Sequence, residues 1–198
     1  MTHSADNHDI AALITGWIHR DVGAWDQLRE LFHPEARISV SWFDGLASDF
    51  VDASAKMGQS ELRSKHVITA PLITFSESGD RAITETNAMV VSENRSLSLG
   101  TVTHNRYIDR VERRAGRWGI VRRESIYDFS SFTFPTGSFT PIKQDVVARF
   151  PIEYASLAYL LVASGFQVER TYPVKNSEQE RSIKKAAADW LSSDEVPI

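Results

Sequence analysis

The first clear pattern in the chain is an apolar stripe with helical spacing over residues 9–21. Its members recur at steps of three and four residues, as on one face of an α-helix: Ile10, Leu13, Ile14 and Trp17. Asp21 lies four residues after Trp17 on the same face. A buried carboxylate is costly unless a hydrogen-bonding or cationic group meets it. We therefore expect Asp21 to point inward and to have a partner.

Three shorter segments follow this helix. Residues 24–32 carry apolar side chains at helical spacing and end before a His-Pro pair, which stops a helix. Residues 36–43 alternate apolar and polar positions, which is the period of a half-buried strand, with Val40 and Trp42 in the apolar phase. The segment 49–63 is predicted to be a polar helix across one end of a sheet.

From residue 66 onward the chain changes to longer strands with turn residues between them. Four strands are predicted, over residues 66–75, 81–92, 97–113 and 117–129. The links are too short for the crossover that parallel neighbours need, so the pairing is predicted to be antiparallel. Helices followed by a meander of strands indicate an α+β fold.

The tail has no strand pattern. An apolar helix is predicted over 151–164, and a final helix begins at Ser177, with Glu180 completing a capping box. We divide the chain into a domain of residues 1–135 and a helical extension of residues 136–198. The extension is expected to pack on the body, on a neighbouring subunit, or over a pocket mouth as a lid.

Composition removes several classes of function. With 22 basic and 26 acidic residues the net charge is -4, so a nucleic-acid partner is not expected. The absence of cysteine excludes disulfides and thiolate metal sites. Neither a secretory signal nor an apolar run of about 20 residues is visible, so we expect a cytoplasmic protein with no membrane partner.

Two histidines on the predicted strands are candidate partners for Asp21. His66 shares a face with Ile68, and His104 shares one with Val102 and Ile108. A single histidine on an apolar face is more often a core residue than a catalyst. A carboxylate and two histidines that converge would instead supply a base, its orienting partner and a second proton carrier. This three-residue hypothesis fails if His66 and His104 lie on opposite faces of the sheet.

The chemistry that such a group supports is proton abstraction from carbon beside a carbonyl. Asp21 would fix the tautomer of His66, which would act as the base, and His104 would protonate a departing hydroxyl. The same parts could also isomerise a substrate. A non-heme iron site is the alternative for two histidines and a carboxylate, but the tight His-x-Asp or His-x-Glu pairing is absent, so we predict no metal.

Several short segments resemble the SnoaL-like members of the NTF2-like superfamily. They are Asp21-Val-Gly-Ala-Trp25-Asp26-Gln-Leu28, Phe32-His-Pro34, Ser64-Lys65-His66-Val67-Ile68 and Gly116-Arg117-Trp118-Gly119-Ile120. Within that superfamily the chain is most similar to scytalone dehydratase and its relatives, whose aspartate and two histidines match Asp21, His66 and His104. The superfamily's dehydrochlorinase shares the Asp-His pair. The resemblance covers roughly residues 8–135.

The resemblance implies a cone-shaped α+β barrel, in which helices wrap a curved sheet around a deep apolar pocket. It also implies cofactor-free chemistry and a homodimer or homotrimer. Two tyrosines with which scytalone dehydratase holds a water against the substrate carbonyl correspond to Arg20 and Val40, neither of which can do the same, so the substrate is expected to differ from scytalone. A polar pair of that enzyme corresponds to positions near Arg123 and Ser125. We expect Val40, Trp42, Arg123 and Ser125 to bind the substrate.

The function expected from the sequence is therefore a cofactor-independent lyase of the dehydratase type. It would act on a hydrophobic small molecule, an aromatic or polycyclic carbonyl compound. An isomerase of the same superfamily is the first alternative. A non-catalytic module that binds a small ligand or a protein, or a structural subunit of an oxygenase, is the second.

Overall fold

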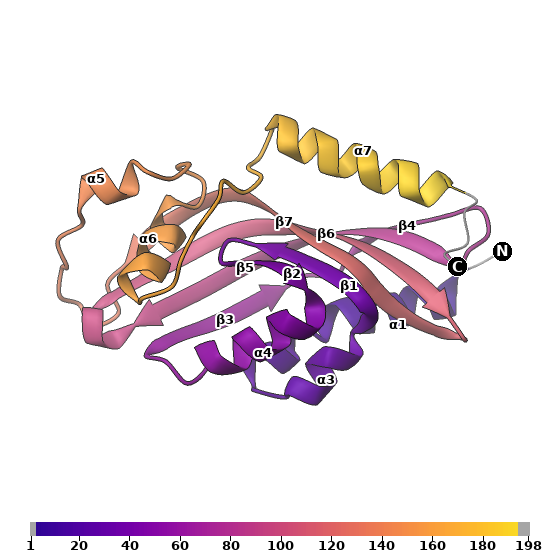
Figure 1. Ribbon diagram of the computed structural model, residues 1–198, viewed down its shortest axis with the longest axis horizontal. Helices are drawn as coiled ribbons and strands as arrows, with labels where there is room; N and C mark the ends of the chain where they lie inside the picture. The colour runs from indigo at the N-terminus through magenta and orange to yellow at the C-terminus, as the bar shows by residue number, and fades with distance from the viewer. Residues whose placement is uncertain (1–2, 194–198) are drawn as a thin grey trace.

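A curved seven-stranded sheet carries the fold (Figure 1). The structure is a computed structural model, and it describes residues 3–193 of the chain. The elements run in the order α1 (Ser4–Thr15), α2 (Ile18–Asp21), α3 (Trp25–Glu30), β1 (Phe32–Val40), β2 (Phe43–Leu46), α4 (Ala47–Met57), β3 (Leu62–Ile68), β4 (Leu72–Phe75), β5 (Arg81–Asn94), a 3-10 turn (Arg95–Leu97), β6 (Leu99–Arg114), β7 (Arg117–Thr133), α5 (Gln144–Val147), α6 (Ala155–Ala163) and α7 (Glu178–Ser192).

The strand order is β2-β1-β7-β6-β5-β3, and β4 also pairs with β5. All pairs are antiparallel except β1 with β7. The parallel pair is possible because the chain crosses from β1 to β7 through most of the domain rather than through a turn. The expected α+β fold with a mostly antiparallel sheet is confirmed.

The concave face of the sheet packs against the N-terminal helices α1 to α4 (Figure 1). The apolar stripe of the first helix is buried as its spacing predicts, with Ile10, Ile14 and Trp17 at most 1% exposed. The sequence predicted one helix over 9–21, which is wrong: α1 ends at Thr15 and α2 begins at Ile18. The break falls at Gly16, where a Cβ would lie 2.7 Å from Leu31 Cδ2.

Two predicted strands are also each divided in two. The strand expected over 66–75 becomes β3 and β4, because Thr69-Ala70-Pro71 interrupts it and proline cannot donate to a ladder. The strand expected over 36–43 becomes β1, which begins earlier at Phe32, and β2, which turns back against it. The predicted polar helix 49–63 is the shorter α4.

The two long helices of the tail lie on different parts of the sheet (Figure 1). The helix α6 packs against β5, β6 and β7 and forms a second core with Tyr127, Tyr154 and Tyr172. The helix α7 crosses the opposite, convex face, where Ile183 and Ala187 pack on Ile108 and Ile126. The C-terminal segment therefore covers both faces of the strands β5 to β7.

A cluster of charges fixes α7 to the convex face. Arg106 on β6 is 2.7 Å from Glu180, 2.8 Å from Glu85 and 2.8 Å from Asp128. The predicted cap is present, because Ser177 Oγ accepts a hydrogen bond from Glu180 N–H, while Glu180 Oε2 accepts one from Asn176 N–H. Burial opposes ionisation of Glu180, but the hydrogen bonds that its carboxylate accepts from Arg106, Asn176 N–H and Lys184 outweigh burial and lower its pKa to about 2.

The lowered pKa of Glu180 predicts how stability depends on pH. Its stabilising effect is complete above the ordinary pKa of 4.5 and is lost as pH falls toward about 2. Glu180→Gln should lower the free energy of unfolding at pH 7 by about 1.5–3 kcal/mol, the usual worth of a charged hydrogen bond. It should also lose less stability than the wild type between pH 5 and pH 3, as urea unfolding measures.

The control is Asp189→Asn, which removes an exposed ion pair with Lys185 on the same helix. It should change the free energy of unfolding by at most about 0.5 kcal/mol at either pH. Equal pH dependence in the wild type and in Glu180→Gln would contradict the role given to this carboxylate.

Candidate functional site

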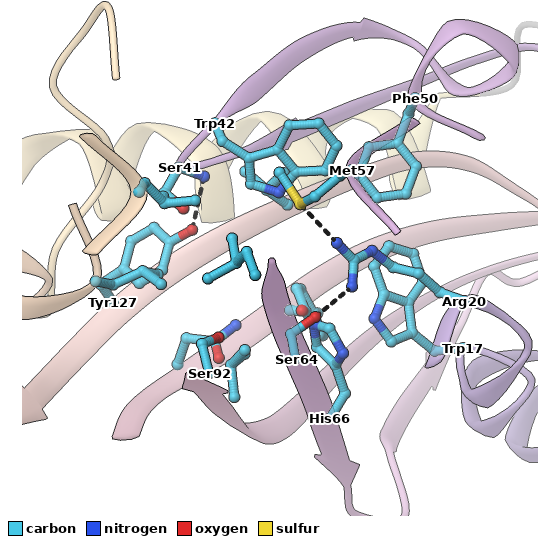
Figure 2. Close-up of a pocket in the computed structure, with 17 residues that line it drawn as sticks. Trp17, Arg20, Ser41, Trp42, Phe50, Met57, Ser64, His66, Ser92 and Tyr127 are labelled. Atoms are coloured by element: carbon cyan, nitrogen blue, oxygen red, sulfur yellow. Dashed lines mark hydrogen bonds between the residues drawn. The ribbon is translucent and has the colours of Figure 1, made fainter. Parts of the chain in front are cut away.

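A small pocket lies between the concave face of the sheet, Trp17 at the start of α2, the helices α2 and α4, and one face of α6 (Figure 2). The free space in it is about 50 Å³. Aromatic and aliphatic side chains form most of its wall, with a few polar groups among them. The lining residues are Trp17, Arg20, Val40, Ser41, Trp42, Phe50, Met57, Leu62, Ser64, His66, Val90, Ser92, Asn105, Tyr107, Tyr127, Leu157 and Leu161.

Asp21 and His66 meet beside this pocket. Asp21 Oδ1 is 2.6 Å from His66 Nδ1, and Asp21 Oδ2 accepts a second bond of 2.6 Å from His66 N–H. The carboxylate side chain is 0% exposed and the imidazole is 8% exposed. Both oxygens of Asp21 are thus bound to one residue, and the inward direction expected from helix spacing is the one the structure has.

Local sequence explains how both side chains reach this place. Trp17 anchors the start of α2 against Phe50 and Tyr107, so the last turn before Asp21 is held against the core. On β3 the inward positions alternate with exposed ones, and Ser64 and His66 face inward. The ring of His66 then contacts Trp17 edge-on, with ring centroids 5.9 Å apart.

The protonation states favour a free base. Burial lowers the pKa of His66, and the charge of Arg20 lowers it further, against the opposing effect of Asp21. Burial alone would raise the pKa of Asp21, but the hydrogen bonds from His66 outweigh it and lower that pKa. An ionised Asp21 accepts a hydrogen bond from Nδ1–H, so the neutral imidazole keeps its proton on Nδ1 and has its lone pair on Nε2. Nε2 has no hydrogen-bond partner among residues 3–193.

Further polar groups from β6 and β7 line the pocket. Tyr127 OH accepts a hydrogen bond of 2.8 Å from Ser41 N–H, and Asn105 Nδ2 donates one of 2.9 Å to Ser125 Oγ. Asn105 Oδ1 is buried without a partner. Burial raises the pKa of Tyr127, so its hydroxyl stays neutral. This side of the pocket can therefore accept and donate hydrogen bonds but cannot readily give up a proton.

The fold agrees with the comparison against protein families. The model of the SnoaL-like domain matches residues 2–124, which is more than half of the chain and includes Asp21, His66 and most of the sheet. The chain belongs to the SnoaL-like family.

Fungal proteins are similar to this SnoaL-like chain. Pea pathogenicity protein 2 of Fusarium vanettenii is 23% identical over 199 residues, which cover 94% of this chain and 85% of that protein. An uncharacterised protein of Aspergillus terreus is 31% identical over 88 residues, but they cover 43% of this chain and only 32% of that protein.

Solved structures share its fold. A candidate scytalone dehydratase from Novosphingobium aromaticivorans has a TM-score of 0.57 and 18% identity, with 65% of this chain and 87% of that chain covered. A hexachlorocyclohexane dehydrochlorinase, LinA-type3, from Novosphingobium barchaimii has a TM-score of 0.58 and 16% identity, with 71% and 96% covered. These identities show the NTF2-like fold alone.

His104 does not join Asp21 and His66 in this SnoaL-like domain. His66 pairs with Val90 and Val90 with Thr103, whereas His104 pairs with Met89, so His104 points to the convex face. There its ring stacks on Phe129 at 4.2 Å. The expectation that all three residues meet in one cavity is wrong, and with it the role of His104 as the acid.

The reason for this error is that both faces of β6 are largely buried. Ile108, which marked the face of His104 as the inner one, is buried under α7 on the outside. The face that looks into the domain carries Thr103, Asn105 and Tyr107. The spacing of apolar residues along β6 therefore does not show which of its two faces lines the pocket and which lies under α7.

The four expected substrate-binding residues have different outcomes. Val40 and Trp42 line the pocket. Arg123 does not: its guanidinium is 0% exposed and binds both oxygens of Asp109 at 2.7 and 2.8 Å. It stacks between Trp17 and Tyr107 as a core ion pair, so its predicted substrate contact is wrong. Ser125 does not line the pocket, but its Oγ accepts a hydrogen bond from Asn105, which does.

Sequence reasoning missed several pocket residues. The sequence shows Arg20 only as a departure from a family tyrosine, although its position directly before Asp21 in the chain indicates that it lies near the site. Asn105 and Tyr127 follow the inner phase of β6 and β7, which the sequence could not identify. Leu157 and Leu161 of α6 line the pocket, and no local pattern links that helix to it.

Two further findings concern the described part of the chain. Among residues 3–193, no helix is both long and apolar enough to cross a membrane. The same residues hold no group of three or more His, Cys, Asp or Glu side chains that could bind a metal ion.

The contact between Asp21 and His66 can be tested in solution. In Asp21→Asn the negative charge that holds the pKa of His66 up is lost, so this pKa should fall further. Loss of charged hydrogen bonds should also lower the free energy of unfolding by about 2 kcal/mol. NMR titration of the His66 ring measures the first effect and urea unfolding the second.

Asp52→Asn is the control, because Asp52 is 64% exposed and its ion pair within the described part of the chain is with Arg29, far from His66 in the fold. It should leave the titration of His66 unchanged. An unchanged titration in Asp21→Asn itself would show that the two side chains do not interact.

Proposed function

We propose that this chain is a cofactor-independent lyase of the dehydratase type. In it the neutral His66 is the base that removes a proton from carbon beside a carbonyl, and Asp21 orients it. One observation carries the proposal: the carboxylate of Asp21 takes both of its close bonds from His66, which leaves Nε2 of the imidazole as the free basic atom beside the pocket. The match to the SnoaL-like family supports it.

The proposed step uses groups of this chain alone. The C–H bond breaks, its proton goes to Nε2 of His66, and its electron pair moves onto the carbonyl oxygen to give an enolate. Asp21 stabilises the imidazolium that forms. In a dehydration, the enolate then re-forms the carbonyl, and a C=C bond forms as the C–O bond to the β-hydroxyl breaks. The same imidazolium gives its proton to this hydroxyl, which leaves as water, because His104 lies on the other face of the sheet.

The pocket also limits the substrate. Its free space of about 50 Å³ is far below the roughly 300–1,000 Å³ of common ligand pockets. We propose that the substrate is at most a carbonyl compound of one or two rings rather than a larger polycyclic one, and that the pocket opens to admit it. Leu157 and Leu161 line the pocket from the tail, and a shift of α6 would widen it.

An isomerase is the second candidate, and one observation favours it. Of the described lining residues, only His66 can exchange a proton near neutral pH, since burial raises the pKa of Tyr107 and Tyr127. A single base that takes a proton from one carbon and returns it to another suffices for isomerisation. A tetralone that carries a β-hydroxyl group distinguishes the two, because loss of water converts it to naphthol.

Solvent exchange tests the shared first step. The wild type should incorporate deuterium from heavy water into β-tetralone faster than buffer does, and His66→Gln should lower this rate by about 10²–10⁴-fold, the usual worth of a general base. NMR of the ketone measures the incorporation. His104→Gln is the matched control and should keep the full rate.

Three results would argue against the proposal. Exchange that is equal in the wild type and in His66→Gln would show that His66 is not the base. Loss of exchange in His104→Gln with the fold intact would restore the three-residue hypothesis. A wild type that binds the ketones without exchange would indicate a non-catalytic binding module.

A further inference from the structure

Arg20 is a buried cation whose own chain gives it few acceptors (Figure 2). Its side chain is 8% exposed. Nη1 donates to Ser64 Oγ at 2.9 Å and Nη2 to the thioether of Met57 at 3.5 Å. A guanidinium has five N–H donors, and a hydroxyl and a sulfur satisfy two of them weakly.

The nearest carboxylate does not neutralise this charge closely. Asp21 Oδ1 is 3.9 Å from Arg20 Nη1, beyond hydrogen-bond distance, and both Asp21 oxygens are already bound to His66. The rings of Trp42 and Phe50, at 5.8 and 6.0 Å from the guanidinium carbon, stabilise a cation only modestly. A buried charge with such incomplete pairing costs stability, which a functional site can justify.

The charge faces a pocket that has no acidic wall. None of the described residues that line the pocket is Asp or Glu, and Asp21 borders a separate cavity of about 170 Å³ on the other side of Arg20. With His66 neutral and the tyrosines protonated, Arg20 is the ionised group on the pocket wall. The described pocket wall therefore carries a positive charge and no negative one, which favours an anion on the His66 side rather than beside Asp21.

We propose that Arg20 binds an anionic oxygen of the ligand next to the base. This inference rests on the proposed function and names its substrate class: a carbon acid whose oxygen becomes an enolate when His66 takes the proton. The two charges then formed are the imidazolium, which Asp21 meets, and the enolate oxygen, which Arg20 meets. In a pocket of low polarity such a fixed cation stabilises the enolate more than the neutral ketone.

Equilibrium binding of a stable oxyanion tests this without turnover. The probe is para-nitrophenol, whose anion is coloured, and para-nitroanisole is its neutral analogue. The wild type should bind the nitrophenolate, and Arg20→Gln should weaken that binding by about ten- to hundredfold, as loss of one charged hydrogen bond does. Binding of nitroanisole should change by less than about threefold, because no charge is involved.

Two further variants make the result specific. Arg20→Lys keeps the charge and should restore part of the anion binding, and Arg20→Met fills the same apolar space if the glutamine variant does not fold. Arg29→Gln removes an arginine that is 45% exposed on α3 and should leave both ligands unaffected. Circular dichroism and urea unfolding establish that each variant is folded.

Equal nitrophenolate binding in the wild type and in Arg20→Gln would overturn the proposal, as would a wild type that binds neither form. Failure of the proposed function gives a different result. In that case β-tetralone shows no His66-dependent exchange, while the nitrophenolate still binds through Arg20 and His66→Gln retains that binding within about threefold.

Discussion

The double hydrogen bond between Asp21 and His66 is the contact on which the site depends. It joins the end of α2 to β3, two segments 45 residues apart, with both bonds at 2.6 Å. An ionised carboxylate that is 0% exposed is stable only with such partners. The same bonds select the Nδ1 tautomer of the imidazole, so the contact that removes an electrostatic cost also prepares the base.

This arrangement lowers the pKa of both residues. Burial and Arg20 lower the pKa of His66, while hydrogen bonds from His66 lower the pKa of Asp21. The pair is therefore held as carboxylate and neutral imidazole rather than as an ion pair. Arg20 contributes to this state through its charge, and the same charge makes the pocket receptive to an anionic oxygen. The incomplete pairing of Arg20 costs stability, and its proposed role in binding the anionic oxygen explains why this cost is kept.

The tail changes what each face of the sheet does. In this SnoaL-like chain α7 covers the convex side through the Arg106 cluster, and α6 supplies Leu157 and Leu161 to the pocket on the concave side. The face of β6 that looks into the pocket carries polar residues, while some of the apolar side chains of that strand, such as Ile108, are buried on the other face under α7. Leu157 and Leu161 of the same tail occupy one side of the pocket and so limit its size.

The sequence by itself determined the succession of helices, strands and a helical tail, the mostly antiparallel sheet and the inward direction of Asp21. Each depends on local spacing, turn residues or the cost of an unpaired charge. Tertiary structure decided which face of β6 is inner, because a two-residue period does not label a face when both are buried. It also decided the phase of β7, where irregular pairing beside His104 and Arg110 moves residues from one face to the other. Tertiary structure also decided the place of Arg123 in the core, because its partner Asp109 lies on another strand and no local pattern links the two residues.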